Sequence, residues 1–203
     1  MPPAFAGGRR LDYLVLDLDA TLIEVHSDQK DQAAAHFKDG FGFHPLLCFL
    51  DNTNEALAGI LRAGNVGSNT AADHLTVLDQ ALAQLPDNAR AERILVRTDG
   101  AGFSHAFIEH LTAAGLEYSL GYAVTEVVRE AISLLPEWAW TIAGNHDGQR
   151  REGAQAADLT LVLAEATRLR RARQARERAA GGKPPTTSKP ATWPDGMRII
   201  VRR

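Results

Sequence analysis

Apolar positions along the first half of the chain recur with the two-residue period of strands and then with the spacing of a helix. Residues 11–25 form an apolar run with aspartates at alternate positions, which is typical of a strand buried on at least one face. Residues 41–51 and 56–63 predict two further strands, and the short turn Asp51-Asn-Thr-Asn54 between them predicts a hairpin. Residues 71–85 then carry leucines at helical spacing.

The middle of the chain alternates between short strands and helices. Residues 93–99 predict a buried strand that ends in an aspartate, and residues 116–124 predict another strand. Helices are predicted over 105–114 and 125–135. Three consecutive strands followed by this alternation predict an α/β fold, a mixed sheet covered by helices.

The two ends of the chain differ from this middle part. Residues 1–10 predict a disordered leader, and residues 11–136 predict a core domain. Residues 137–203 combine short strand-like runs with an Arg/Ala segment that predicts a helix. The Pro-rich stretch 181–194 predicts a loop or disorder, and 197–203 predict a strand. A strand at the last residue leads us to expect a truncated chain.

Composition narrows the class of protein. The chain has 203 residues, of which 45% are hydrophobic and 23% charged, as in a globular protein with one domain and an appendage. Its single cysteine, Cys48, excludes a disulfide framework and predicts a buried core residue. No apolar run approaches the ~20 residues that span a bilayer, and the start has no signal-peptide core. We therefore expect an intracellular protein without a membrane partner.

Charge is distributed unevenly. The formal net charge of −3 argues against a nucleic-acid partner. The segment from Arg168 to Arg178, however, holds six arginines against one glutamate. A basic arm beside an acidic core occurs in enzymes that cut nucleic acids, and it also arises from Arg/Ala-rich composition alone.

The first strand carries carboxylates that could do chemistry. Asp17, Asp19 and Thr21 project from one face, because side chains two residues apart share a face of a strand. Burying acids in an apolar strand is costly unless something compensates them, and a divalent cation would do so. Alternatively, one aspartate lies at the strand end and accepts hydrogen bonds from backbone amides.

A second strand brings a further acid. If the first and fourth strands are neighbours, Asp19 and Asp99 share one site. Carboxylates from adjacent strands suit Mg²⁺ or Mn²⁺. Two such ions ~4 Å apart activate a water or a 3′-hydroxyl and stabilise the leaving oxygen of a phosphodiester.

A phosphatase is an alternative. The run DLDATL matches the DxDxT signature of haloacid-dehalogenase-type phosphatases, in which Asp17 would be the nucleophile and Asp19 the acid/base. The chain lacks their late acidic pair, and its three early strands fit poorly with a fold that alternates strand and helix from the start.

Several segments, taken in order, resemble transposase DDE domain group 1 of bacterial insertion-sequence transposases. The matching segments are LVLDLDATLIEVH (14–26), GFHPLLCFLDNTNEALAGILRAGN (42–65), ILVRTDGAGF (94–103), GLEYSLGYAV (115–124), REGAQAADLT (151–160) and WPDGMRIIVRR (193–203). This resemblance implies an RNase H-like core over 11–136 and the start of a β-rich insertion over 137–203.

The resemblance also implies roles. Asp19 and Asp99 map onto catalytic, metal-binding acids, and Asp17 is either a ligand or a neighbour of the ligands. The intact enzyme is expected to hold two Mg²⁺ or Mn²⁺ ions and to cut and join DNA at transposon ends. It is expected to act as a homodimer in the bacterial cytoplasm, associated with the nucleoid.

The third acid of the family is a glutamate on a helix after the insertion, which we expect beyond Arg203. The chain would then be feeble or inactive alone, or a non-catalytic remnant that binds DNA. Glu126 and Glu130 follow Asp99 at a tempting distance, but a solvated helix face is the favoured interpretation of Glu130.

Two groups of residues are candidate DNA contacts. The first group lies in or beside family-like segments, where ordinary turn chemistry is the favoured alternative: Lys38, His44, Arg62 and Asn65. The second lies in the basic arm: Arg170, Arg171 and Arg173.

Overall fold

The structure is a computed structural model that describes residues 1–203 except 28, 68–69, 91, 181–193 and 195. Nearly all of the Pro-rich stretch predicted at 181–194 therefore lies outside the described residues. The chain divides into two compact units, unit 1 (1–5 and 10–122) and unit 2 (6–9 and 123–203). The division by contacts falls at Ala123, earlier than the boundary of 136 expected from sequence.

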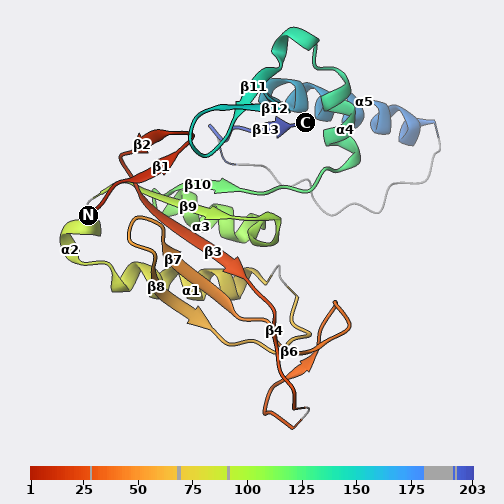
Figure 1. Ribbon diagram of the computed structural model, residues 1–203. Helices are drawn as coiled ribbons and strands as arrows, with labels where there is room; N and C mark the ends of the chain where they lie inside the picture. The colour runs from red at the N-terminus through yellow and green to blue at the C-terminus, as the bar shows by residue number, and fades with distance from the viewer. Residues whose placement is uncertain (28, 68–69, 91, 181–193, 195) are drawn as a thin grey trace. The chain divides into compact units, whose positions relative to one another are not determined.

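A five-stranded mixed sheet forms the centre of unit 1 (Figure 1). Its central strand β3 (Leu14–Ala20) pairs in parallel with β9 (Ile94–Thr98) and antiparallel with β7 (Leu46–Leu50). The outer strands are β10 (Glu117–Leu120), parallel to β9, and β8 (Glu55–Ile60), antiparallel to β7. The expected α/β fold and the predicted hairpin are thus confirmed.

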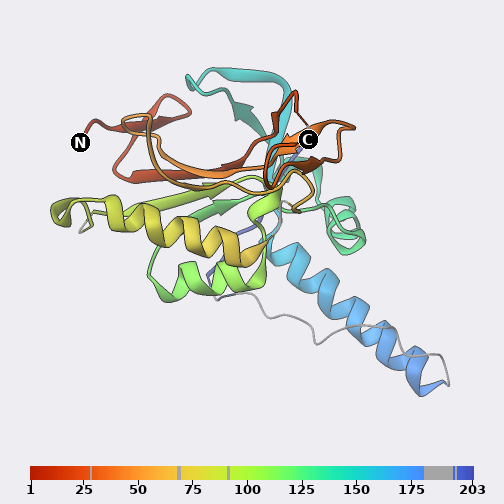
Figure 2. The same ribbon diagram turned by 90° about the horizontal axis from the view of Figure 1, so that it is seen from below.

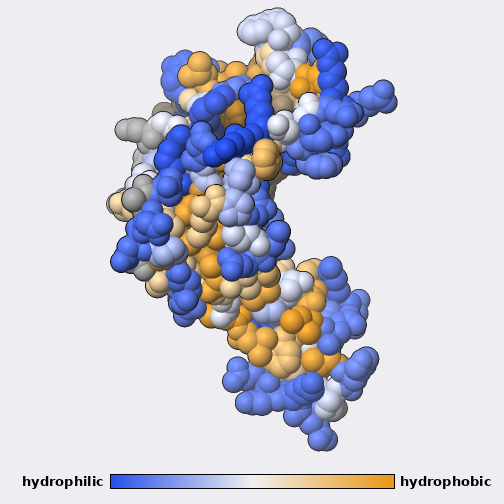
Figure 3. Space-filling view, turned by 60° about the vertical axis from the view of Figure 1, so that its left-hand side comes forward, coloured by the Kyte–Doolittle hydropathy of each residue, from blue (hydrophilic) through white to orange (hydrophobic). Residues whose placement is uncertain are grey.

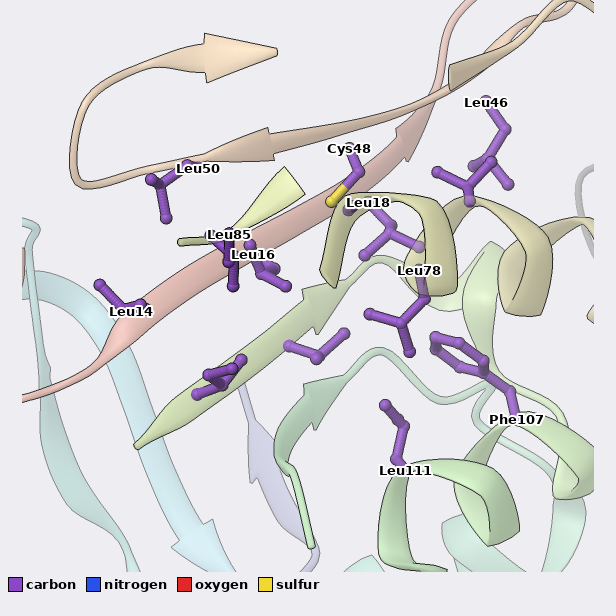
Figure 4. Packing of buried hydrophobic residues seen from close by; sticks show 14 of the residues in the cluster. Leu14, Leu16, Leu18, Leu46, Cys48, Leu50, Leu78, Leu85, Phe107 and Leu111 are labelled. Carbon is purple, nitrogen blue, oxygen red and sulfur yellow. The ribbon is translucent and has the colours of Figure 1, made fainter. Parts of the chain in front are cut away.

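Helices cover one face of this sheet. α1 (Ala71–Gln84) and α3 (His105–Ala113) lie on the same side of the strands (Figure 2). Alternate residues of β3 point toward them and form the core (Figure 4) with the buried side chains Leu14, Leu16, Leu18, Leu46, Cys48, Leu50, Leu78, Phe107 and Leu111. Two short helical segments, α2 (Asp87–Arg90) and η1 (Gly100–Gly102), flank β9.

Two predicted strands are each divided between two sheets. The predicted strand 11–25 contains β3 and β4 (Ile23–Glu24), and 41–51 contains β6 (Phe41–Phe43) and β7. Pro45 separates β6 from β7, because proline has no N–H to donate to a ladder. Residues 26–39, between these two predicted strands, contribute β5 (Ala34–Ala35). β4, β6 and β5 form a separate small sheet, and we call residues 23–43 the finger.

The N-terminal residues are ordered in strands, so the expected disordered leader is corrected. β1 (Ala4–Ala6) pairs with β2 (Arg9–Leu11) in a two-stranded sheet. Gly7 and Gly8 between them have φ of 56° and 70°, which glycine adopts without steric cost.

Unit 2 contains a three-stranded antiparallel sheet in the order β11 (Thr141–Gly144), β12 (Arg150–Asp158) and β13 (Ile200–Arg202). α4 (Glu126–Ser133) and α5 (Thr160–Ala179) pack against each other through a small apolar cluster; the 3₁₀ helix η2 (Glu137–Ala139) follows α4. None of the helices in the described part of the chain is long and apolar enough to cross a membrane.

The start of α5 is held by a carboxylate. Asp158 accepts a hydrogen bond from the Thr160 backbone N–H at 2.9 Å and another from Arg198 Nη2 at 2.8 Å. These contacts lower the pKa of Asp158 to about 2, and the hydrogen bonds with Thr160 contribute most to this shift.

Candidate functional site

The register between β3 and β9 brings two predicted acids to the same edge of the sheet. Leu18 pairs with Thr98, so Asp19 and Asp99 occupy the next positions on parallel strands. Parallel neighbours lie about 4.8 Å apart. The expected juxtaposition of Asp19 and Asp99 is therefore present.

Both acids line an open cleft of about 730 Å³ on the face of the sheet opposite α1 and α3. Four of its side chains are carboxylates and one is an arginine; the lining residues are Asp17, Leu18, Asp19, Phe49, Asp51, Asn54, Arg97, Thr98 and Asp99.

Asp17 is neutralised by an arginine. The Nε of Arg97 donates to Asp17 Oδ1 at 2.5 Å, and its Nη2 donates to Asp17 Oδ2. The same Nη2 lies 3.3 Å from Asp51 Oδ2. These contacts, the hydrogen bonds to Asp17 first, raise the pKa of Arg97 above its usual value. Asp17 therefore needs no cation to compensate its partial burial.

Asp19 is in a different environment. Its side chain is exposed, and its Oδ1 accepts a hydrogen bond from the Ala20 backbone N–H at 2.8 Å. The expectation that a cation must compensate these aspartates is thus corrected, because Asp17 has an arginine partner and Asp19 is in contact with solvent.

Close backbone packing positions Asp99. Gly121 donates its N–H to the Thr98 carbonyl at 3.1 Å, and a Cβ at Gly121 would lie 2.5 Å from the nitrogen of Gly100. On the other side, a Cβ at Gly102 would meet the Thr98 side chain at 2.2 Å. Glycine is required at both positions, and together they hold the turn that follows β9.

The donor atoms fit a hard cation, although the set is small. Asp19 and Asp99 provide carboxylate oxygens, the ligands that Mg²⁺ and Mn²⁺ prefer. Asp17, the third predicted ligand, is bound to Arg97. In the described part of the chain, no group of three or more His, Cys, Asp or Glu side chains is arranged to hold a metal ion.

Two predicted DNA contacts are buried and have internal roles. His44 is 4% exposed and its Nδ1 lies 3.1 Å from the Val66 carbonyl oxygen. Arg62 is 5% exposed; its Nε donates to the His44 carbonyl at 2.8 Å and its Nη1 pairs with Asp73 at 3.2 Å. These side chains hold the loop before α1, so their assignment to DNA is corrected.

The other predicted DNA contacts differ in whether their side chains form ion pairs. Lys38 and Asn65 are exposed. In α5, Arg170 pairs with Glu126 at 2.8 Å and Arg173 lies 3.8 Å from Glu177, whereas Arg171 is exposed.

Glu126 and Glu130 belong to α4 in unit 2. The Arg170 guanidinium lowers the pKa of Glu126, which thus serves a contact within its own unit.

Among the cleft residues that were not predicted from sequence are Phe49, Asp51 and Arg97. A signal for Arg97 was present, because it lies two residues before Asp99 and so shares its face of the strand. Phe49 and Asp51 became neighbours of Asp17 only through the register of β3 with β7, in which Asp17 pairs with Phe49.

Residues 5–203 match the family model described as transposase DDE domain group 1. The chain belongs to this family. The comparison with curated proteins gives no match. The five-stranded mixed sheet flanked by helices is consistent with the RNase H-like fold expected for a transposase DDE domain. Transposases act on DNA, and enzymes of this family generally use divalent metal ions.

The same findings weigh against the phosphatase alternative. Asp17, its required nucleophile, is held in a two-point contact with Arg97. The strand β3 also has an antiparallel neighbour, β7, where the alternating strand–helix order of a phosphatase would give parallel pairing.

Proposed function

We propose that the cleft is the site at which this transposase domain carries out metal-dependent phosphodiester chemistry on DNA. The observation that carries the proposal is the parallel register of β3 and β9, which aligns Asp19 with Asp99 in a family that acts on DNA. Asp19 and Asp99 are the proposed ligands of Mg²⁺ or Mn²⁺. When bound, such ions activate a water or a 3′-hydroxyl and stabilise the leaving oxygen.

Arg97 and Asp17 have a supporting role in this proposal. Arg97 contacts both Asp17 and Asp51, so that the neighbourhood of Asp19 contains a cation among its carboxylates. This reduces repulsion of the DNA backbone, which carries one negative charge per phosphate. Asp17 is therefore proposed as a neighbour that orients Arg97 instead of a ligand.

The test is the binding of Mn²⁺ to the full chain, measured by electron paramagnetic resonance. We expect the substitutions Asp19→Asn and Asp99→Asn each to weaken binding strongly, because each removes a charged oxygen donor. Asp12→Asn is a matched control, since the Asp12 side chain is 83% exposed and pairs with Arg10 at 3.5 Å. Equal Mn²⁺ binding by all four proteins would overturn the proposed ligand pair.

Activity is a second measurement. The third acid expected from the family is not among the described residues grouped around the cleft. We therefore propose that the chain alone nicks DNA carrying transposon ends feebly or not at all in Mg²⁺. Robust nicking that disappears in Asp19→Ala would overturn this part and show that the carboxylates of this cleft suffice.

DNA binding without cleavage is a second candidate function, favoured by α5. Arg171, Arg176 and Arg178 are exposed, and no carboxylate of the described residues lies within ion-pair distance of them. Each phosphate that such a helix neutralises lowers the logarithm of affinity by about 0.9 per decade of salt. Replacing these three arginines by glutamine should flatten that slope, and an unchanged slope would exclude α5 as the contact.

The homodimer inferred from the resemblance also stays a proposal. Light scattering of the chain with and without DNA would measure its mass, and a monomer in both states would contradict it.

A further inference from the structure

The finger ends in a tight turn whose conformation is fixed by one buried histidine. The His36 side chain is 1% exposed, and its Nδ1 accepts a hydrogen bond from the Lys38 backbone N–H at 3.3 Å. The His36 N–H donates to the Gly40 carbonyl at 2.9 Å, and the Asp39 N–H donates to the His36 carbonyl at 3.2 Å. The residues between, Phe37 and Lys38, are therefore held in a fixed backbone.

Two further features restrict this turn. Asp39 has a φ of 59°, a left-handed conformation that aspartate tolerates better than most residues. A Cβ at Gly40 would lie 2.4 Å from His36 Nε2, so only glycine fits against the imidazole ring. The turn is thus built around its histidine.

The exposed side chains of this turn are an aromatic ring, an ammonium group and the carboxylate of Asp39. Phe37 is 74% exposed, whereas Phe107 in the core is fully buried. Lys38 Nζ lies 5.7 Å from the centre of the Phe37 ring. In the space-filling view the finger, at the lower end, shows apolar surface bordered by hydrophilic side chains (Figure 3). A large exposed ring on a fixed backbone loses little conformational entropy when a planar partner stacks on it.

We propose that Phe37 and Lys38 form a binding site for unpaired nucleotides of a DNA strand. The aromatic ring stacks on a base, and the ammonium group pairs with the adjoining phosphate. This combination of stacking platform and cation is the one by which proteins bind single strands without reading their sequence. Bases inside a duplex are stacked on each other, so the ring reaches only an unpaired or displaced base. The inference rests on the proposed action on DNA and specifies one of its substrate forms.

The experiment measures binding of a fluorescein-labelled single strand, and of the duplex of the same sequence, to the full chain by fluorescence anisotropy. Phe37→Ala should weaken single-strand binding by about 5- to 150-fold, the range for loss of one base–aromatic stack, and Phe37→Trp should restore it. Duplex binding should change little. Phe5→Ala is the matched control, because the Phe5 side chain is likewise exposed, at 59%, but lies in β1 and not in the finger.

Lys38→Gln tests the ammonium group. It should reduce the salt slope of single-strand binding by about 0.7, the value for one phosphate contact on a single strand, and Lys30→Gln in the same finger should not. Circular dichroism of each variant checks folding, which the replacement of an exposed side chain should not affect.

The outcomes separate the two proposals. Equal single-strand affinity of Phe37→Ala and the unaltered chain overturns the stacking site alone. Equal loss for single strand and duplex also overturns it, since stacking on an unpaired base would act on one form. If Phe37→Ala weakens single-strand binding while Asp19→Asn leaves Mn²⁺ binding intact, only the proposed metal site falls. Failure of the unaltered chain to bind either form of DNA overturns both.

Discussion

The two faces of the five-stranded sheet are made by the same strands but have opposite characters. On the face covered by α1 and α3, Leu14, Leu16 and Leu18 of β3 are almost completely buried. On the other face, Asp17 and Asp19 of the same strand line an open cleft. The covered face stabilises the fold through burial of apolar area, and the open face can carry charge because solvent and Arg97 lower its cost. Alternate residues of β3 therefore serve different purposes: those on the covered face stabilise the fold, and those on the open face line the cleft. This separation can be tested.

The largest effect is expected on the covered face. Leu16→Ala should lower the free energy of unfolding by about 2–5 kcal/mol, because it leaves a cavity in the core. Urea denaturation followed by circular dichroism measures this loss. Phe49→Ala on the open face is the matched control; Phe49 is 37% exposed, so its loss should be clearly smaller. Similar losses for both would contradict the separation.

The turn after β9 is the next most sensitive place. Gly121→Ala puts a Cβ 2.5 Å from Gly100 N and 2.8 Å from the carbonyl carbon of Asp99. Such overpacking costs about 1–3 kcal/mol, and it should also displace Asp99 and weaken Mn²⁺ binding. Gly67→Ala, with no atom within 4 Å of the new Cβ, should change neither property. Unaltered Mn²⁺ binding in Gly121→Ala would show that the position of Asp99 does not depend on this packing.

The ion-pair network of the open face should contribute less. Arg97→Met leaves Asp17 and Asp51 without their shared partner, and the partly exposed site limits the loss of stability to the order of 1 kcal/mol. Adding Asp17→Asn should recover part of this loss, since it removes one of the unpaired charges. A double-mutant cycle by urea denaturation measures the coupling, and strictly additive effects would mean that the pair is not coupled.

The smallest effect is a pH dependence of the covered face. Burial first, and the Asp17 carboxylate second, raise the pKa of Cys48 from 9.0 to about 12. The unfolded chain therefore releases this proton at lower pH than the folded chain, and stability from the neutral thiol is lost as pH rises above 9. The stability advantage of the unaltered chain over Cys48→Ala should shrink by about 1 kcal/mol between pH 8 and pH 10. A constant difference would mean that the thiol ionises normally.

Local sequence patterns predicted most helices and strands, because the spacing of apolar residues that favours each element lies within the element itself. The helix predicted at 71–85 is present as α1 at 71–84, and the strand predicted at 93–99 is β9 at 94–98. The strands predicted at 11–25 and 41–51 were too long, since apolar character continues from one sheet into another and periodicity does not record the change. The N-terminal leader was mispredicted because β1 and β2 stabilise each other by pairing, which composition does not indicate.

The type of a residue likewise indicated which contacts it could make, but it did not indicate whether the side chain would be exposed or buried. Lys38 and Arg62 both looked like phosphate contacts, but Lys38 lies on an exposed turn while Arg62 is buried against His44 and Asp73. Nothing within the sequence near Arg62 indicated this, because the contact with Asp73 is made across the loop that leads into α1.

The sequence by itself predicted the mixed α/β architecture, the resemblance to the family, and the position of Asp99 at the end of its strand. These follow from periodicity and motif order, which are properties of neighbouring residues. Only the tertiary structure decided that Arg97 holds Asp17, that Asp19 is exposed, and that Phe37 is displayed beside Lys38. The first two depend on which strands become neighbours and in which register, and the third depends on the burial of His36 inside the finger.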